Sequence, residues 1–267
     1  MIPSAIVDPW ESGDPYEQYV GRWSRRVALP FLDWLRVPAG RRWLDVGCGT
    51  GALSAAILER CSPSSVTAVE PSAGFREKAG RLLAGRVRVR DGSATEIPLE
   101  DRCVDATVSG LVLNFVADQR AALAEMARVS VPGGAIAAYV WDYAGRMEMM
   151  RVFWDAAVEL DAGAAALDEG ARFPACNPAA LADLFTRAGL QEVEVTDIEI
   201  AMHFASFEEF WRPFLGGQGP APGYVTALDE AARTRLCGRV RDRLPTRADG
   251  SISLAARAWA VRGMVAG

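Results

Sequence analysis

A glycine-rich turn with an acidic residue in front of it carries the clearest chemical signal in this chain. The turn follows an apolar run and contains three glycines at alternate positions, Gly47, Gly49 and Gly51. Asp45 stands two residues before the first glycine, and Glu70 and Asp91 stand at the ends of the next two apolar runs. Glycine permits a sharp turn and lets a ligand approach the main chain closely. The spacing therefore predicts a site where backbone groups and three carboxylates meet one ligand.

The charge of these residues discriminates between nucleotide-like ligands. The glycine spacing is G-x-G-x-G, whereas the dinucleotide fingerprint is G-x-G-x-x-G. Asp45 would repel a pyrophosphate but attract a ligand that carries an ammonium and a sulfonium, which describes S-adenosylmethionine (SAM). We expect Glu70 to accept both ribose hydroxyls, a role that NAD enzymes share, and Asp91 to accept from the adenine amino group. Backbone contacts to the adenine ring are expected from Gly92, Ser93 and Ala94.

The elements that must position these residues follow a strand–helix rhythm. Apolar runs predict strands over residues 41–46, 66–70, 87–90, 104–112 and 135–141. Helical spacing predicts helices over residues 50–60, 71–83 and 118–129. Repeated strand-helix-strand units with short connections imply right-handed crossovers and a doubly wound sheet. Ligands bind at the carboxyl edge of such a sheet, where this arrangement places the glycine turn and the acids together.

Outside this region the pattern changes. A helical segment over 16–35 precedes the first strand, and Pro30 is expected to divide it. Further helices are expected over residues 146–160, 177–187, 207–215 and 224–244, with a loop at 216–223. Strands over 192–204 and 251–261 are expected to form an antiparallel pair at the sheet edge, with a lid between them. We therefore expect a helical cap over 1–40, a ligand-binding core over 41–145, and a C-terminal part of the same domain over 146–267 with the lid at about 204–250.

Four segments together resemble the ordered motifs of class I SAM-dependent methyltransferases: Leu44–Gly51, Val69–Ser72, Asp91–Ala94 and Arg128–Gly134. The set is most similar to the small-molecule branch (methyltransferase type 11) that includes the ubiquinone and menaquinone C-methyltransferases. It covers about residues 16–142. The resemblance implies an α/β fold with a Rossmann-like, doubly wound, mostly parallel seven-stranded sheet, an antiparallel edge strand and a helical cap or lid.

The resemblance also implies roles for individual residues. It implies that Ser109 and Leu111 line the methionine side of SAM, and that Tyr19, Arg22 and Trp23 close over it, with Arg22 pairing with the SAM carboxylate. The predicted cofactor contacts are Tyr19, Arg22, Trp23, Asp45, Gly47, Cys48, Gly49, Gly51, Glu70, Pro71, Asp91, Gly92, Ser93, Ala94, Ser109 and Leu111. For Tyr19, Arg22 and Trp23, the alternative is that they pack a cap helix on the core.

Candidate acceptor contacts and catalytic groups lie after the fourth predicted strand. The acceptor candidates are Asn114, Trp141, Phe207, Trp211, Phe214 and Tyr224, and the catalytic candidates are His203, Asp142 and Tyr143. Asn114 stands where members of this branch often carry a histidine. For the aromatic residues of the lid, the alternative is packing in the lid core, and for residues 142–143 it is capping of the next helix. For His203, the alternative is a structural role. For the arginines of 233–243, a solvated helix face is expected rather than a site that binds an anion.

Composition excludes several function classes. The net charge of −5 disfavours a surface that holds a phosphate backbone, so no nucleic acid partner is expected. Five dispersed cysteines without a C-x-x-C pair, and no signal-peptide pattern, favour a reduced cytoplasmic setting. His203 is the only histidine, which argues against a histidine-based metal site, and no apolar run has the length of a membrane span. A single lysine among 29 basic residues is typical of a GC-rich bacterial composition.

The predicted activity is SAM-dependent methyl transfer by in-line displacement to a small, apolar or aromatic organic acceptor, with S-adenosylhomocysteine as product. Ser109, Gly110, Leu111 and Val112 stand where amino methylases of DNA bases or glutamine carry Asn/Asp-Pro-Pro-Tyr. The acceptor atom (O, N or C) and the oligomeric state stay open. The alternatives are an NAD(P)-dependent reductase on a similar fold and a SAM-binding protein with other chemistry.

Overall fold

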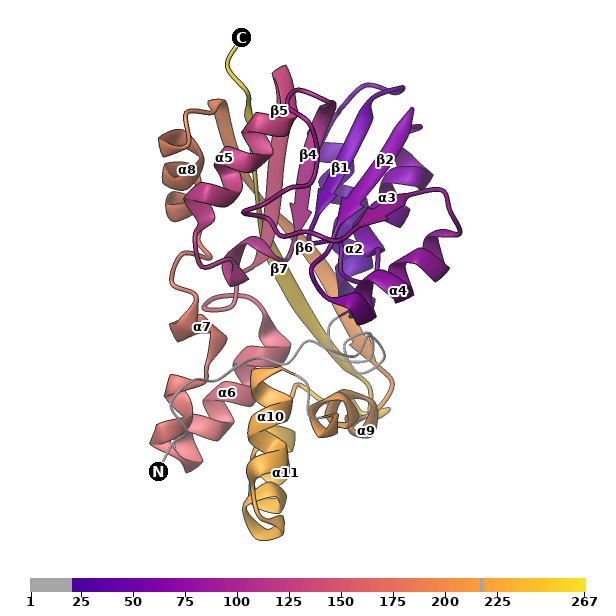
Figure 1. Ribbon diagram of the computed structural model, residues 1–267. Helices are drawn as coiled ribbons and strands as arrows, with labels where there is room; N and C mark the ends of the chain where they lie inside the picture. The colour runs from indigo at the N-terminus through magenta and orange to yellow at the C-terminus, as the bar shows by residue number, and fades with distance from the viewer. Residues whose placement is uncertain (1–20, 217–218) are drawn as a thin grey trace. The chain divides into compact units, whose positions relative to one another are not determined.

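A seven-stranded sheet with the order β3-β2-β1-β4-β5-β7-β6 organises the chain (Figure 1). The computed structural model describes residues 21–216 and 219–267. The strands are β1 (Arg42–Val46), β2 (Ser65–Val69), β3 (Arg88–Arg90), β4 (Val104–Gly110), β5 (Ser130–Trp141), β6 (Gln191–Phe204) and β7 (Ile252–Met264). The first five pair in parallel, and β7 pairs antiparallel with β5. The predicted fold, a mostly parallel sheet with an antiparallel edge, is confirmed.

Helices cover both faces of this sheet. The α-helices are α2 (Arg22–Leu35), α3 (Ala52–Arg60), α4 (Ala73–Leu83), α5 (Gln119–Val129), α6 (Glu148–Leu160), α7 (Glu169–Arg172), α8 (Pro178–Arg187), α9 (Phe207–Trp211), α10 (Pro220–Ala227) and α11 (Glu230–Arg243). Short 3-10 helices are η2 (Leu113–Phe115), η3 (Ala162–Ala166) and η4 (Arg212–Leu215). In Figure 1, α5 and α8 lie on one face of the sheet and α2 lies on the other.

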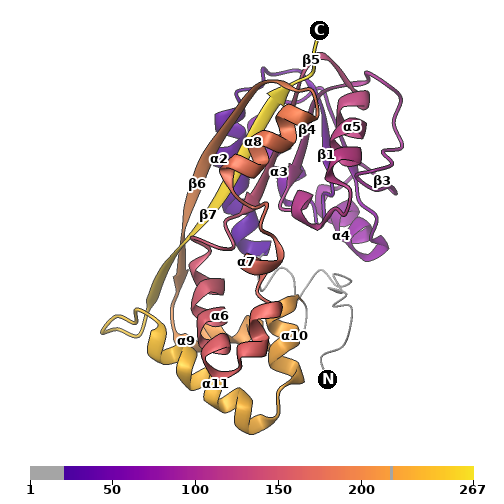
Figure 2. The ribbon, with the colours of Figure 1, turned by 90° about the vertical axis from the view of Figure 1, so that its left-hand side faces the viewer.

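The chain divides into two units, which we describe separately. The sheet unit consists of Trp23–Trp141, Ala175–Ile198 and Ala258–Gly267. The helical unit consists of Asp142–Pro174 and Glu199–Arg257, together with Arg22 among the described residues that precede the sheet unit. Strands β6 and β7, which Figure 2 shows as long neighbours, contribute residues to both units.

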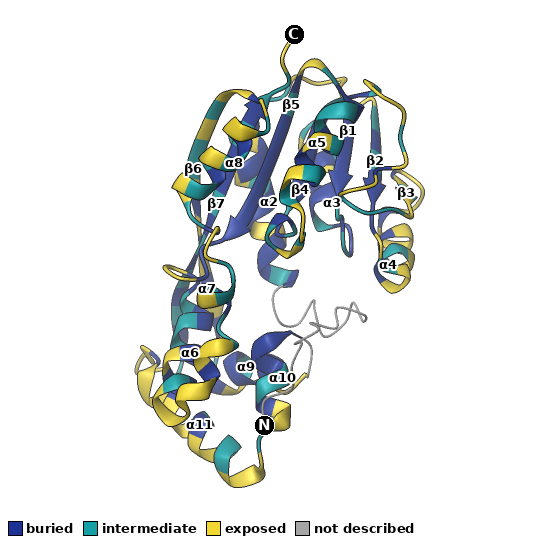
Figure 3. Cartoon of the chain, turned by 60° about the vertical axis from the view of Figure 1, so that its left-hand side comes forward, coloured by how far each residue is buried: buried dark blue, intermediate teal, exposed yellow. Residues whose placement is uncertain are grey.

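The core of the sheet unit lies along its central strands. Figure 3 shows these strands as almost continuously buried. Trp43 and Leu44 of β1, Ala106 of β4 and Tyr139 of β5 are at most 2% exposed. This near-continuous burial is what a parallel strand covered on both faces requires, and it makes the loops at the strand ends the available places for binding.

Three expectations about helices and loops were wrong. Pro30 lies inside a continuous helix α2 rather than dividing it, and Pro30 itself is solvent-exposed. The helix is held instead by its opposite, buried face, which includes Val27, Phe31 and Leu35. The expected loop at 216–223 is partly helical, because Pro220 is accommodated in the first turn of α10. The single helix expected over 224–244 is two helices, since Asp229 caps α11 by accepting from the Ala232 N–H at 2.7 Å.

Candidate functional site

The glycine turn joins the end of β1 to helix α3. The backbone N–H groups of Gly47 and Cys48 both donate to the Val69 carbonyl, at 2.8 and 3.1 Å, which ties the turn to the end of β2. All three glycines have positive φ angles: 73° at Gly47, 54° at Gly49 and 93° at Gly51. A side chain at Gly47 would place its Cβ 2.6 Å from Val112, whereas one at Gly49 would meet no atom within 4 Å. The backbone at Gly49 is therefore open to a ligand.

Asp45 is a buried carboxylate beside this turn. It is 1% exposed, and the Ser54 hydroxyl donates to its Oδ2 at 2.7 Å. Burial raises the pKa of Asp45 to about 7; the bonds from Ser54 lower it, and the nearby Glu70 raises it further. Within residues 21–216 and 219–267, no arginine or lysine forms an ion pair with Asp45. A cationic ligand would supply the charge that this carboxylate lacks.

Glu70 braces the turn from the end of β2. Its Oε2 accepts from the Gly49 N–H and its Oε1 from the Ser72 N–H, each at 2.9 Å. The side chain is buried, and burial raises the pKa of Glu70. The hydrogen bonds from the two backbone N–H groups lower it, but by less. Both oxygens thus already accept one hydrogen bond. Each keeps a second lone pair, so ribose binding by Glu70 stays a prediction.

Asp91 lies beyond β3 and is largely exposed. Its side chain is 73% exposed, and its Oδ1 accepts from Arg76 at 2.9 Å. The same guanidinium donates to the carbonyls of Glu70, at 2.9 Å, and Pro71, at 2.6 Å. Arg76 therefore links the two strand ends from which Glu70 and Asp91 project. In the neighbouring loop, Ser93 exchanges backbone hydrogen bonds with Glu96, and the adenine contacts expected here stay predictions.

The loop after β4 closes against the glycine turn. The Ser109 hydroxyl is buried and donates to the Val46 carbonyl at 2.9 Å, so it joins the ends of β4 and β1. Leu111 adopts a φ of 62°, unusual for a branched side chain, and its N–H donates to the Tyr139 carbonyl at 2.8 Å. Such strain is often found at functional sites.

Cys48 lies inside the turn, in surroundings that favour a small packing residue over a nucleophile. Its side chain is buried, and burial together with Asp45 and Glu70 raises the pKa of the thiol far above its usual range. A thiol needs a lowered pKa to react as a thiolate at neutral pH. The interpretation of Cys48 as a small residue of the turn is the one that these surroundings favour.

The catalytic candidates at the end of β5 have structural contacts. Asp142 is buried and accepts from the backbone N–H of Gly145 at 3.1 Å and of Arg146 at 2.9 Å. Its Oδ2 also accepts from Arg257 Nε at 2.9 Å and from a terminal nitrogen at 2.6 Å. Tyr143 is buried, with its ring 5.6 Å from that of Phe173. These contacts favour the structural alternative for both residues.

The aromatic candidates belong to the packed interior of the helical unit. Phe207 and Trp211 stack with their ring centroids 6.1 Å apart, and Phe214 stacks on Phe153 at 4.6 Å. The Tyr224 hydroxyl donates to Asp161 at 3.4 Å. Trp141, at the end of β5, is 2% exposed and lies within the sheet unit.

Other predicted residues pair within their own units. The ring nitrogen Nδ1 of the exposed His203 lies 3.0 Å from the Ser253 hydroxyl. Arg22 forms an ion pair with Glu209 at 2.8 Å, so its guanidinium already has a carboxylate partner. Trp23 is buried on α2, and Tyr19 lies outside the described residues.

The arginine run over residues 233–243 is largely engaged in helix-to-helix contacts. Arg239 and Arg243 both pair with Glu159, at 3.0 and 2.5 Å. Arg241 pairs with Glu208 at 3.7 Å and lies over the Phe207 ring. These three arginines therefore hold α11 to other elements of the helical unit.

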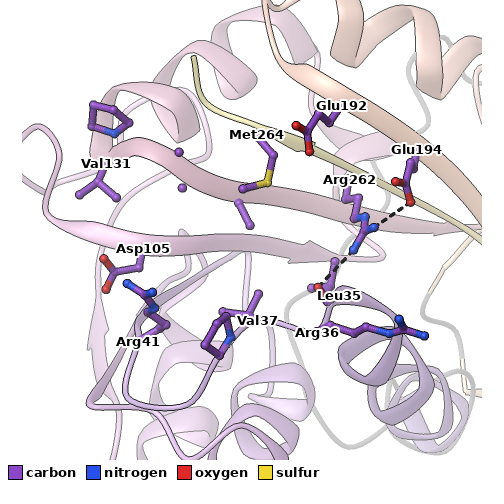
Figure 4. Close-up of a pocket in the computed structure, with 15 residues that line it drawn as sticks. Leu35, Arg36, Val37, Arg41, Asp105, Val131, Glu192, Glu194, Arg262 and Met264 are labelled. Carbon is purple, nitrogen blue, oxygen red and sulfur yellow. Dashed lines mark hydrogen bonds and ion pairs between the residues drawn. The ribbon is translucent and has the colours of Figure 1, made fainter. Parts of the chain in front are cut away.

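A cavity of about 580 Å³ lies at the opposite, amino edge of the sheet (Figure 4). Its lining includes Arg41 and Asp105 near the starts of β1 and β4, and Arg262, which pairs with Glu194 at 2.8 Å. None of the site residues predicted from the sequence lines it. It is therefore separate from the glycine turn at the carboxyl ends of the strands.

Sequence reasoning missed two residues of the site. Ser54 lies in the first turn of α3, where its spacing from Asp45 gave no signal. Arg76 lies on α4, and its three acceptors come from two loops, the one after β2 and the one after β3. An arginine one turn into the helix after Glu70 is the signal that could have drawn attention to it.

Comparison with known proteins finds relatives over the region that contains the glycine turn. A family model described as a methyltransferase domain matches residues 44–138. An uncharacterized methyltransferase of Mycobacterium tuberculosis is 39% identical over 111 residues, which are 42% of this chain and 44% of that protein. A demethylmenaquinone methyltransferase of Clavibacter sepedonicus is 40% identical over 100 residues, 37% of this chain and 40% of that protein. The chain thus spans less than half the length of these curated relatives.

Solved structures share the fold. The YcgJ protein of Bacillus subtilis has a TM-score of 0.58 at 17% identity, over 92% of this chain and 99% of that one. A phosphoethanolamine N-methyltransferase of Haemonchus contortus, solved with SAM, has a TM-score of 0.57 at 16% identity, over 94% of this chain and 56% of that one. The matched region contains the glycine turn, Glu70, Asp91 and the loop after β4. Residues 44–138 match the methyltransferase-domain family model, and the predicted resemblance to class I methyltransferases is confirmed over this region.

Proposed function

We propose that this protein binds SAM at the glycine turn and transfers its methyl group to a small, apolar or aromatic organic acceptor. The observation that carries the proposal is the pair of buried carboxylates, Asp45 and Glu70, beside an open backbone at Gly49. Burial raises the pKa of both carboxyls, so the site favours a ligand that brings positive charge to it. A dinucleotide would instead bring its pyrophosphate toward Asp45.

The residues of the turn have separate proposed roles. Asp45 attracts the cationic methionine part of SAM, and Glu70 orients the ribose while bracing Gly49 and Ser72. Ser109 fixes the end of β4 against β1. The bound SAM supplies an electrophilic methyl group on a sulfonium, and S-adenosylhomocysteine remains after the transfer. The protein's task is to position the acceptor in line with that methyl group and to exclude water.

The other parts of the proposal rest on the sequence. The acceptor contacts Asn114, Trp141, Phe207, Trp211, Phe214 and Tyr224, the catalytic groups His203, Asp142 and Tyr143, and the domain boundaries at residues 40 and 145 stay predictions. A cytoplasmic location is also proposed. Among the described residues, no helix is long and apolar enough to cross a membrane.

Calorimetry with SAM, S-adenosylhomocysteine and NADH tests the cofactor. We expect SAM and S-adenosylhomocysteine to bind and NADH not to bind. Glu70→Ala should weaken SAM binding at least tenfold, about 1.4 kcal/mol. Glu77→Ala serves as the matched control, because Glu77 is an exposed residue of α4 whose ion pair within the described part of the chain is with Arg81 on the same helix. Binding of NADH without binding of SAM would establish the reductase alternative and contradict the proposal.

A turnover assay separates methyl transfer from other chemistry on SAM. Purified protein is incubated with methyl-labelled SAM and a panel of small aromatic acceptors, and both S-adenosylhomocysteine and labelled product are measured. We expect the two to form in equal amounts. Consumption of SAM without a methylated product would establish other chemistry on SAM and contradict the proposal, and methylation of RNA or protein alone would show that the acceptor class is wrong.

A further inference from the structure

The loop after β4 contains a partly buried asparagine whose polar side-chain atoms have no hydrogen-bond partner among the described residues. Both polar atoms of the Asn114 carboxamide, Nδ2 and Oδ1, are buried, and no group of the described residues bonds to either. A buried amide without partners destabilises the folded protein, because its polar groups lose their hydrogen bonds to water and gain none in return. Structural asparagines are normally satisfied. The exception therefore calls for a functional explanation.

The backbone on both sides of Asn114 is fixed by hydrogen bonds. Asn114 is the middle residue of η2, whose Leu113 carbonyl accepts from Gln119 Nε2 at 2.9 Å. The Phe115 N–H donates to the Val112 carbonyl at 2.8 Å. The two residues that flank Asn114 are thus both fixed by hydrogen bonds.

This loop adjoins the glycine turn. Val112, two residues before Asn114, fills the space beside Gly47, where a Cβ would lie 2.6 Å from its side chain. The strand that precedes the loop, β4, pairs with β1, which carries Asp45. Asn114 therefore belongs to the same edge of the sheet unit as the proposed SAM site.

We propose that the Asn114 carboxamide receives the acceptor molecule and selects a neutral group that presents a hydrogen-bond donor next to an acceptor. The inference rests on the function proposed above and names the acceptor class for that site. A carboxamide, a neutral carboxylic acid, or a hydroxyl beside a carbonyl satisfies both Nδ2 and Oδ1 at once. A carboxylate would leave Oδ1 facing a second acceptor oxygen without a donor, and an ammonium would leave Nδ2 unpaired; each would also require burial of a charge.

Asn114 acts as a positioning residue rather than as a base. A carboxamide does not take up a proton near neutral pH, so its contribution is to orient the acceptor and to discriminate between acceptors. A site built to hydrogen-bond one polar group rejects analogues that lack it far more strongly than an apolar pocket does.

Two variants and a matched control test the inference. Asn114→Leu removes both polar atoms, and Asn114→Asp replaces the donor by a second acceptor with a negative charge. Asn177→Asp is the control, because Asn177 Oδ1 caps α8 by accepting from the Ala180 N–H at 2.9 Å and aspartate caps equally well. Thermal unfolding is measured without ligand, and binding of benzamide, benzoate and benzylamine is measured by NMR titration with S-adenosylhomocysteine present.

We expect Asn114→Leu to raise the midpoint of unfolding by about 2–4 °C, because it removes unsatisfied buried groups. The unaltered protein should bind benzamide at least tenfold more tightly than benzoate or benzylamine. Asn114→Leu should lose this preference, Asn114→Asp should turn it toward benzylamine, and Asn177→Asp should change neither binding nor unfolding.

A lower midpoint in Asn114→Leu would overturn the inference, since it would mean that the amide is already satisfied in the free protein. An unchanged benzamide preference in Asn114→Leu, or no preference in the unaltered protein, would overturn it as well. In those cases retained binding of S-adenosylhomocysteine leaves the proposed function standing. If the unaltered protein does not bind S-adenosylhomocysteine, that result would contradict both the inference about Asn114 and the proposed function.

Discussion

Replacing Asp45 by asparagine should stabilise the free protein and weaken its cofactor binding at the same time. The carboxyl group is 1% exposed, and burial raises its pKa from 3.8 to about 7. Because the folded-state pKa lies above the unfolded-state value, the folded protein binds this proton more tightly. Asp45 therefore lowers stability progressively as pH rises from about 4 to about 7, and the loss is complete above that range.

The size of the effect follows from the pKa shift. One pKa unit corresponds to about 1.4 kcal/mol, so the raised pKa of Asp45 costs on the order of 4 kcal/mol of stability at pH 8 but only about 2 kcal/mol at pH 5. Asparagine does not titrate and can still accept the hydrogen bond from Ser54. The advantage of Asp45→Asn over the unaltered protein should thus widen by roughly 2 kcal/mol between pH 5 and pH 8.

Chemical denaturation at pH 5 and pH 8 measures the stability half of this prediction, and SAM calorimetry over the same range measures the other half. SAM affinity of the unaltered protein should rise with pH up to about 7 as Asp45 ionises, and should be weaker and nearly independent of pH in Asp45→Asn. Asp118→Asn is the control, because Asp118 caps α5 from an exposed position and asparagine caps equally well. A stability gap that does not widen with pH would refute the reasoning that Asp45 is an uncompensated buried carboxyl.

Two further predictions concern the glycine turn and the helical unit. Gly47→Ala should lose about 1–3 kcal/mol of stability, because its Cβ would lie 2.6 Å from Val112 at a φ of 73°; Gly49→Ala should lose less, because its Cβ meets no atom within 4 Å, yet it should weaken SAM binding. Equal melting temperatures for the two variants, or unchanged SAM affinity in Gly49→Ala, would speak against this geometry. Glu169→Gln should stabilise the protein more at pH 8 than at pH 5, because burial raises the pKa of Glu169 to about 7 while its Oε2 accepts from the Trp154 indole. Denaturation at both pH values checks this, and a pH-independent difference would show that Glu169 does not titrate there.

The sequence by itself determined the features that depend on neighbouring residues. Apolar runs locate the strands β1 to β5 and helical spacing locates the helices between them. Glycine at alternate positions predicts the sharp turn, in which the structure has positive φ angles. The acids at the ends of β1 and β2 follow from the same local pattern. The order of the motifs was enough to predict the family resemblance and the fold.

Only the tertiary structure decided how these residues are charged and paired. Asp45 is a residue with a raised pKa because strands and helices distant in sequence bury it. Asp142 is engaged by Arg257, which lies 115 positions later in the chain, and Arg76 joins the ends of β2 and β3. Burial and long-range pairing depend on which segments meet in space, and no periodicity within one segment encodes that meeting.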